Sequence, residues 1–514
     1  MKKDKREELE LKENLEKKIN GFGLENKLKI YNTMSRTVED FTPIDEDNVR
    51  VYTCGPTVYH YAHVGNMRAY VFADLLQRTL RTLYPTVTHV INITDVGHLV
   101  GDGDEGEDKL EKGAKREGKS VWDIAKYYTD AFMNDLNLLN IDADNYIFPR
   151  ATDFIKEQIN NIEKLERRGY TYTTADGIYF DTSKYANYGE LAKLDIKNLQ
   201  AGERVEMGEK KNKTDFALWK FSPTDQERQM EWIFEGDKKG LLIDREFKIL
   251  LSDQEKKTAG FPGWHIECSA MSEAILGKHF DIHTGGIDHI PVHHTNEIAQ
   301  SECAHDNEKG YAGFVNYWCH VNFLNDKSGK MSKSNDEFLR LKTLQDKDYN
   351  INSFKYLLYT TSYRKELEFS YESLDAANTA FIKLCKYMNT EAKVKENIVD
   401  ATKYRINTPV YDEFMSAIYN DLNTSSALAV MWDMISNKSA HAYSTMLAMN
   451  KILGFNLEHK EESLEDKLSQ MSDSTKNKIL EMLEQRKIAR ANKDWATSDV
   501  LRSELQAHGV DVVD

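Results

Sequence analysis

The chain has 514 residues, enough for two to four domains that each bury a core of their own. No apolar run reaches the ~18 residues of a membrane span, and the highly charged start lacks the apolar segment of a secretory signal, so we expect a cytoplasmic protein with no membrane partner. The net charge of −16 argues against indiscriminate nucleic-acid binding but leaves a selective RNA partner open.

Residues 1–28 form a charged N-terminal extension, and an α/β pattern begins at about residue 29. Val51–Thr53 and Val87–Ile93 have the composition of buried strands, and an amphipathic helix is predicted over Ala69–Leu83 between them. This alternation is typical of α/β proteins. It predicts a Rossmann-like, doubly wound parallel sheet within residues 29–330, which would bind ligands beyond the carboxyl ends of its strands.

The stretch Tyr52–Asn66 places polar groups at that edge of the sheet. It reads as a strand that ends in Cys54, a Gly-Pro turn, and a helix that opens with His63, Gly65 and Asn66. Because helix N-termini present free N–H groups, His63 and Asn66 are placed where phosphate oxygens would bind.

One insertion is predicted within the sheet domain. Residues of about 120–235 mix helices with short strands, of which Gly177–Asp181 is one, and form a connective insertion. The sheet domain resumes near Phe261.

A metal site is predicted from Cys54, Cys268 and the run His293-His294-Thr-Asn-Glu297. Five cysteines, an odd number spread along the chain, do not make a disulfide framework. Glu297 shares a helix face with His293 at i,i+4 or with His294 at i,i+3, and spacing alone does not choose between them. Two thiolates, an imidazole and a carboxylate suit Zn²⁺.

From Lys330 onward, the sequence first offers two lysines to a phosphate site and then has the pattern of helices. Lys330 and Lys333 lie in Lys-Met-Ser-Lys-Ser334, a loop that would bring positive charge to phosphates, and residues 331–370 continue from it. Residues 371–470 are predicted as a helical bundle, with helices over the ranges Asp375–Met388, Tyr411–Asn423 and Ser426–Ser436. Residues 471–514 have two helical runs and a short β-prone tail, Val510–Val513.

From about residue 28 to residue 514 the chain resembles the cysteinyl-tRNA synthetases, a family of class I aminoacyl-tRNA synthetases. The matching segments, in order, are Tyr52–Asn66, Asn92–Val96, Asp215–Lys220, Gly263–Met271, His293–Gln300, Lys330–Ser334 and Asp421–Thr424. Each is modest evidence alone, but their joint order is highly specific.

The resemblance implies roles for individual residues. One Zn²⁺ per chain would be held by Cys54, Cys268, His293 and Glu297. The cysteine pocket would be lined by Thr57, Thr94, Trp264 and His283. ATP, with Mg²⁺, would contact Gly65, Gly285, Gly286, Asp288 and Lys333. His63, Asn66, Lys330 and Lys333 would stabilise the transferring phosphate. Residues 471–514 would form an anticodon-binding domain, with contacts from Arg490, Trp495, Asp499 and Asp514.

The implied activity is the ATP-dependent ligation of L-cysteine to tRNA(Cys) through a cysteinyl-adenylate, carried out by a monomer. A zinc ion with a free position would select cysteine, because a substrate thiolate coordinates it well and a serine hydroxyl does not. Two alternatives remain open. One is a ligase that gives cysteine to a small amine in thiol-cofactor biosynthesis; the other is a non-catalytic tRNA-binding paralogue.

The sequence departs from the family pattern at four places. Between Trp232 and Gly260 it is longer than the family usually is, and the charged residues of about 233–259 are predicted as an extra insertion that forms a surface loop or helix of unknown role. His289 stands where Leu is common, and at i−4 from His293 it is an alternative ligand or a partner of one. Asn-Asp-Glu-Phe338 follows the lysine loop where Leu/Ser-Gly-Asn-Phe is common. The sequence ends at Asp514 without the basic tail of many relatives, so fewer anticodon contacts are expected.

Overall fold

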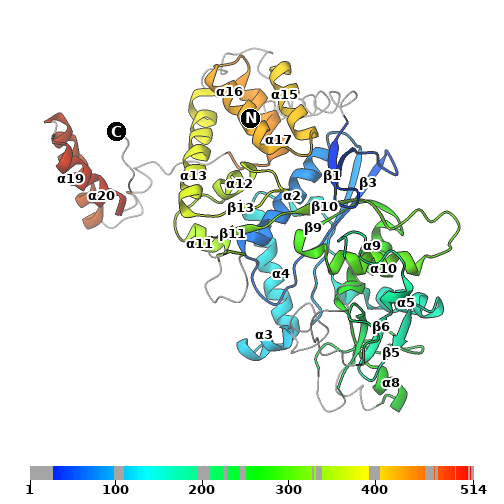
Figure 1. The fold of residues 1–514 in the computed structure, drawn as a ribbon. Helices are drawn as coiled ribbons and strands as arrows, with labels where there is room; N and C mark the ends of the chain where they lie inside the picture. The colour runs from blue at the N-terminus through cyan, green and yellow to red at the C-terminus, as the bar shows by residue number, and fades with distance from the viewer. Residues whose placement is uncertain are drawn as a thin grey trace, which may run out of the picture. The chain divides into compact units, whose positions relative to one another are not determined.

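The computed structural model describes residues 27–97, 109–194, 209–223, 228–243, 250–326, 329–330, 339–392, 406–457, 468, 473–492, 494–507 and 510. These residues fall into two compact units, Met1–Asn456 and Leu457–Asp514 (Figure 1). The charged extension over residues 1–28 lies almost entirely outside the described residues.

A four-stranded parallel sheet forms the centre of the first unit. Its strands, in spatial order, are β10 (Val315–Val321), β9 (Phe280–Gly286), β3 (Asn48–Thr53) and β4 (Thr86–Ile91). β3 and β4 confirm the two predicted strands, and their parallel pairing confirms the predicted sheet. β10, at the edge of the sheet, was not predicted. A separate antiparallel hairpin of β1 (Lys29–Asn32) and β2 (Thr37–Asp40) precedes it.

Helix α2 (Val64–Leu80) connects β3 to β4. It begins directly after His63, where the sequence predicted a helix to open, and five residues before the amphipathic stretch predicted from Ala69. His63 and Asn66 form a capping box there, in which each side chain accepts a hydrogen bond from the other's backbone N–H. Its buried side includes Val64, Met67 and Leu76, which pack in the core of the unit.

An antiparallel sheet has three of its four strands in the predicted connective insertion. Its order is β5 (Thr171–Thr173), β6 (Gly177–Phe180), β7 (Phe216–Phe221) and β8 (Gly260–Pro262), of which β8 lies beyond the predicted bounds. α3 (Lys109–Glu117) precedes the insertion, and the helices within it are α4 (Val121–Leu138), η1 (Ala143–Asn145), η2 (Ala151–Phe154), α5 (Ile155–Arg167) and η3 (Thr182–Lys184).

The described part of residues 233–259 lies at the surface, with Leu241, Leu242 and Leu250 exposed, and is anchored by a few buried side chains. Ile233, Ile243, Leu251 and Ala259 form a small buried cluster, and Trp232 bridges to Leu242 and Gly260. α8 (Asp253–Thr258) closes the segment with a capping box at Ser252. These contacts attach the segment to the edge of the connective sheet.

The chain then returns to the central sheet. The elements here are α9 (Trp264–Leu276), η4 (Ile287–His289) and α10 (His293–Ala304). A second small sheet follows, with the order β12 (Gly329–Lys330), β11 (Leu324–Asp326) and β13 (Leu367–Glu368). β11 is antiparallel to β12 and parallel to β13.

Helices dominate the rest of the first unit. They are α11 (Leu341–Gln345), α12 (Ile351–Tyr359), α13 (Tyr371–Lys386), η5 (Tyr387–Ala392), α15 (Thr408–Tyr419), α16 (Thr424–Ser436) and α17 (Ala442–Leu453). α13, α15 and α16 confirm the three predicted helices within a few residues. Figure 1 shows α15, α16 and α17 lying together.

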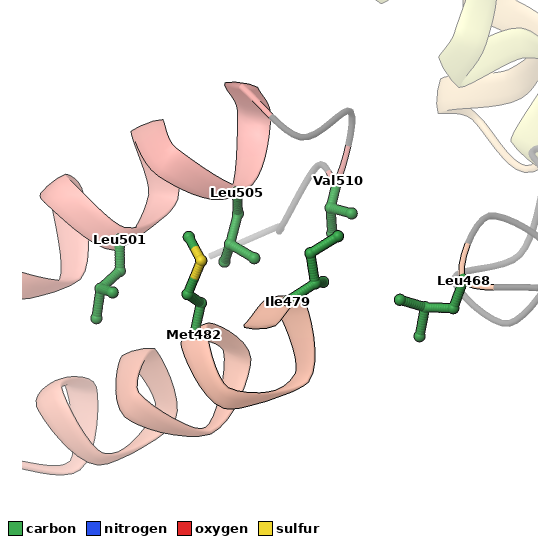
Figure 2. Packing of buried hydrophobic residues seen from close by; sticks show 6 residues of the cluster. All are labelled: Leu468, Ile479, Met482, Leu501, Leu505 and Val510. Carbon is green, nitrogen blue, oxygen red and sulfur yellow. The ribbon is translucent and has the colours of Figure 1, made fainter. Parts of the chain in front are cut away.

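The second unit is a helix pair, α19 (Asp473–Ala491) and α20 (Trp495–Ala507). Ile479 and Met482 face Leu501 and Leu505 across the pair, and Leu468 and Val510 belong to the same cluster (Figure 2). The predicted tail over residues 511–513 lies outside the described residues. No helix in the described part of the chain is long and apolar enough to span a membrane.

Candidate active site and metal centre

The candidate metal ligands converge from three elements at the carboxyl edge of the central sheet. Cys54 follows β3, Cys268 lies on α9, and His293 and Glu297 lie one turn apart on α10. The donor atoms of these four side chains all lie within 4.8 Å of one another, and all four residues are buried. The geometry therefore fits one cation held by two sulfurs, one nitrogen and one oxygen, a donor set that suits zinc.

A second possible ligand group shares two of these residues. Cys54, His283, His294 and Glu297 also bring their donor atoms within 4.8 Å of one another. His294 Nε2 lies 3.2 Å from Cys54 Sγ, and His283 Nε2 lies 2.7 Å from a Glu297 oxygen. The choice between His293 and His294, open in the sequence, is thus also present in the geometry. The first group contains both thiols, which is the softer donor set and the one we favour for zinc.

A second layer of side chains orients both histidines. His293 Nδ1 lies 2.9 Å from His265 Nδ1, and His294 Nδ1 lies 2.8 Å from His320 Nε2. The sequence did not single out His265 or His320. Hydrogen bonds to the distal nitrogen of a ligating imidazole fix its ring orientation, so these two residues support the centre from behind.

His289 belongs to neither group. Its ring centroid lies 5.3 Å from that of His293 and 5.1 Å from that of His294. Burial and the neighbouring His293 lower its pKa to about 4, so it is neutral at pH 7. Instead of joining either ligand group, it forms part of the pocket wall.

Burial and close contact shift the ionisation of the ligands. Burial raises the pKa of Cys54, whereas a hydrogen bond from Cys54 lowers the pKa of Cys268. Burial lowers the pKa of His293, but Glu297 and Cys268 overcome it and raise the pKa to about 10. For Glu297, burial alone would raise the pKa, but His283 and His293 hold that pKa well below its usual range. A bound cation would favour the loss of protons from the thiols and from His293.

A pocket of about 200 Å³ opens beside this centre. Its lining includes Cys54, Thr57 and Trp264, the proposed ATP contacts Gly65, Gly286 and Asp288, and also His63, Asn66 and His289. Thr94, His283 and Gly285 are not among its lining residues. The segment Val321–Leu324, which also lines the pocket, was not predicted from the sequence. The pocket thus runs from the metal ligands to the N-terminus of α2.

The proposed cysteine-binding residues lie together. Thr57 and Thr94 form a parallel backbone bridge, and the Trp264 ring lies 4.6 Å from the His293 ring. Gly55 is enclosed beside them, because a Cβ at this position would lie 1.5 Å from the carbonyl oxygen of Asn92. His283 is fully buried behind the pocket and contacts Glu297.

Of the proposed ATP contacts, Gly65, Gly286 and Asp288 line the pocket, and Gly285 precedes Gly286 on β9. Gly285 and Gly286 end β9, and a Cβ at Gly285 would lie 2.5 Å from His289 Nδ1. Lys330 ends β12, where its backbone pairs with Asn325. Lys333 lies outside the described residues.

The anticodon candidates fall in the second unit. The guanidinium of Arg490 lies 5.9 Å from the centre of the Trp495 ring, which is 57% exposed at the start of α20. Asp499 lies on α20, and Asp514 is outside the described residues. An exposed tryptophan beside an arginine provides a surface on which an unpaired base can stack.

Comparison with known proteins agrees with this arrangement. Residues 40–234 and 254–379 match the model for the catalytic domain of class I (C) tRNA synthetases, and residues 476–514 match the cysteinyl-tRNA ligase anticodon-binding domain. The chain belongs to the cysteinyl-tRNA synthetase family. The family model passes over residues 235–253, within the further insertion expected at about 233–259.

Curated relatives match over nearly the whole length. The chain is 45% identical to cysteine–tRNA ligase 1 of Burkholderia lata, with 95% of each chain covered. It is 41% identical to the cysteine–tRNA ligase of Novosphingobium aromaticivorans, again over 95% of each. Among solved structures, methionyl-tRNA synthetase of Mycobacterium tuberculosis superposes with a TM-score of 0.54 at 14% identity, covering 84% of this chain and 95% of that one. This last likeness shows the class I synthetase fold.

Proposed function

We propose that this chain ligates L-cysteine to tRNA(Cys) in two steps at the pocket beside Cys54. The observation that carries the proposal is that two buried thiols, a histidine and a glutamate meet at one end of a pocket whose other end holds His63 and Asn66. The family membership and the match to an anticodon-binding domain support tRNA(Cys) as the acceptor rather than a small amine. Because the proposed metal ligands and the proposed phosphate-binding residues His63 and Asn66 meet at one pocket, a non-catalytic paralogue is disfavoured.

The first step joins cysteine to AMP. The substrate carboxylate attacks the α-phosphorus of ATP, a P–O bond forms, and pyrophosphate leaves. His63 and Asn66 lie at the N-terminus of α2, where the positive end of the helix dipole favours the negative charge that develops. Lys330 and Lys333 would add cationic charge, and Mg²⁺ would accompany ATP. No side chain needs to act as a nucleophile, since positioning and charge supply the rate enhancement.

The second step moves the cysteinyl group. A ribose hydroxyl of the terminal adenosine of tRNA attacks the acyl carbon, an ester forms, and AMP leaves. Arg490, Trp495, Asp499 and Asp514 would read the anticodon. We assign residues 29–330 to catalysis, 331–370 to stem contact, 371–470 to the bundle and 471–514 to anticodon binding, in a cytoplasmic monomer.

Selection of cysteine would depend on the metal centre. Zinc, when bound by Cys54, Cys268, His293 and Glu297, supplies a position that a thiolate fills well and a hydroxyl fills poorly. Thr57, Thr94, Trp264 and His283 would orient the rest of the amino acid. A pocket without such a bond separates near-isosteres by only about 10²-fold.

Cysteine-dependent ATP–pyrophosphate exchange, followed by charging of a tRNA with a GCA anticodon, tests this function. Exchange with cysteine but not serine, followed by charging, is expected. Exchange without charging would support the small-amine ligase. Absence of exchange by zinc-loaded protein would overturn both enzymatic functions.

A further inference from the structure

Arg68 is a buried arginine with an unusual set of partners. It lies on α2, one turn after Gly65, and only 3% of its surface is exposed. Its guanidinium donates hydrogen bonds to four main-chain carbonyls: to Asn322 at 2.9 Å, to Phe323, to Ser362 at 3.2 Å and to Lys365 at 2.7 Å. Within the described part of the chain no carboxylate pairs with it, so the side chain acts here as a planar fork of donors.

The four acceptors share a location at the base of the small sheet. Asn322 and Phe323 lead into β11, and residues 362–365 lead into β13. The two segments also bond to each other, since Asn322 N–H donates to Tyr363 O at 2.8 Å and Leu367 N–H donates to Phe323 O at 3.1 Å. Arg68 therefore holds the entry points of two adjacent strands against α2.

The third strand of that sheet carries a proposed catalytic lysine. β12 pairs with β11 through Asn325 and Lys330, and it ends at Lys330. The segment that contains Asn322 and Phe323, Val321–Leu324, also lines the pocket together with His63 and Asn66. A shift of this segment would change the distance between the start of α2, where His63 and Asn66 lie, and the end of β12, where Lys330 lies.

A second contact fixes the chain beyond the lysine loop to the same helix turn. The first N–H of α2, that of Val64, donates to the carbonyl of Leu339 at 2.9 Å. The next residue, Arg340, places its guanidinium 4.2 Å from the centre of the Tyr61 ring. The first two turns of α2 thus bind the chain on both sides of the 330–334 segment.

The chemistry explains why arginine occupies this position. Four carbonyls in two segments need at least four donors spread over a plane, and only a guanidinium supplies them from one side chain. Burial lowers its pKa to about 10, so it remains charged at neutral pH. A lysine would offer its donors from a single nitrogen and could not span both segments.

We propose that Arg68 is a positioning residue for the ATP step, an inference that rests on the proposed function. By fixing β11 and β13 to α2, it sets the distance between the His63–Asn66 helix turn and the strand that ends at Lys330. Substitution of Arg68 should therefore change the binding or reaction of ATP. It should not change the binding of cysteine, which is proposed to take place at the metal centre.

Lys355 provides a matched control. It is also a buried cation beside α2, but its Nζ binds Asp74 at 3.0 Å and the carbonyls of Leu139 and Gly454 at 3.1 Å and 2.9 Å. None of these partners lines the pocket. Loss of either cation should lower thermal stability, but only Arg68 should alter the handling of ATP.

The test uses the full-length, zinc-loaded wild type, Arg68→Gln, Arg68→Lys and Lys355→Met. Melting temperature, zinc content, pyrophosphate exchange and calorimetric binding of a non-hydrolysable ATP analogue are measured for each. In Arg68→Gln we expect about a tenfold or greater rise in the KM for ATP or fall in kcat, with the KM for cysteine and zinc content within about twofold. Arg68→Lys should be intermediate, and Lys355→Met should match wild type in exchange.

Equal losses of exchange in Arg68→Gln and Lys355→Met, in proportion to their melting temperatures, would overturn the proposal. A rise in the KM for cysteine equal to that for ATP would also overturn it. If Arg68→Gln does not fold, Arg68→Lys decides by the same criteria. A wild type that shows no exchange would refute the proposed function. In that case, weaker binding of the ATP analogue by Arg68→Gln but not by Lys355→Met would still support the positioning role of Arg68.

Discussion

His63 and Asn66 hold each other at the start of α2 through two reciprocal hydrogen bonds. Asn66 N–H donates to His63 Nδ1 at 3.1 Å, and His63 N–H donates to Asn66 Oδ1 at 3.2 Å. The same pair that is proposed to contact phosphates thus also caps the helix. Removal of either side chain should have two separable effects, one on stability and one on chemistry.

Asn66→Ala tests this separation. Loss of the cap should destabilise the protein by about 1 kcal/mol, and loss of a polar group beside the phosphates should reduce pyrophosphate exchange by about 10²-fold. Ser120→Ala is the matched control, because Ser120 caps α4 by accepting from Asp123 N–H at 3.1 Å. Ser120→Ala should lower the melting temperature similarly and leave exchange near the wild-type rate. Equal exchange in the two variants would mean that Asn66 is only a cap.

The metal ligand set is tested by zinc content. Cys268→Ala should reduce bound zinc well below one per chain, because it removes one of two thiolates. Cys385→Ala is the control, since Cys385 is also buried but lies on α13. Unchanged zinc in Cys268→Ala would show that the assigned ligand set is wrong.

The two histidines can be separated in the same assay. His293→Gln should lose zinc, whereas His294→Gln should retain it with lower affinity, by about 10–100-fold as is typical of residues behind a ligand. The opposite order would place the ion in the group formed by Cys54, His283, His294 and Glu297. Atomic absorption after exhaustive dialysis measures both variants.

Trp495 is expected to act on tRNA and not on adenylate formation. Trp495→Ala should weaken tRNA charging by about 1–3 kcal/mol of lost stacking, or roughly 5–150-fold in kcat/KM, with pyrophosphate exchange unchanged. Val500→Ala on the same helix is the control, because Val500 is similarly exposed at 58%. Parallel loss of exchange and charging in Trp495→Ala would instead indicate a structural role.

His89 should make the stability of the first unit depend on pH in acid. Burial lowers the pKa of His89 to about 3, and its ring contacts Thr53 and Gln77. Between about pH 3 and the unfolded value near 6.5, the unfolded state binds more protons, so stability falls as pH falls through this window. At most about 1.4 kcal/mol is lost per pH unit.

The contribution of His89 is isolated by a difference measurement. His89→Gln should show a shallower fall in melting temperature than wild type between pH 6.5 and 4, and a parallel course above pH 7. Identical slopes for the two proteins below pH 6.5 would contradict the buried, neutral state of His89.

Sequence reasoning predicted two strands of the central sheet, β3 and β4, from their buried-strand composition, but it did not predict β9, which carries Asp, His and two Gly residues. Val51–Thr53 and Val87–Ile93 lie within or overlap β3 and β4. β10 was missed, since Val315–Val321 mixes Asn, Tyr, Trp and His with its aliphatic residues and has no clean pattern. The start of α2 was predicted from His63, Gly65 and Asn66, whereas apolar periodicity alone placed the helix over Ala69–Leu83, five residues late at its start and three at its end.

The sequence predicted part of the candidate site. Motif residues such as Cys54, His63 and Asp288 lie at one pocket, as the resemblance implied. The second ligand group was not predicted in full, because its convergence depends on how β9 and α10 pack. The role of Arg68 left no trace in the sequence, since its partners are backbone oxygens in segments about 250 and 300 residues away.

This choice of partners has a consequence for how the protein evolves. Every amino acid has a carbonyl oxygen, so positions 322, 323, 362 and 365 can change their side chains without losing the contact with Arg68. Arg68 should then vary little among homologues while its neighbours drift, and no pair of positions should change together. Methods that infer contacts from correlated substitutions would therefore not detect the contacts between Arg68 and these four carbonyls, whereas the three-dimensional structure shows them.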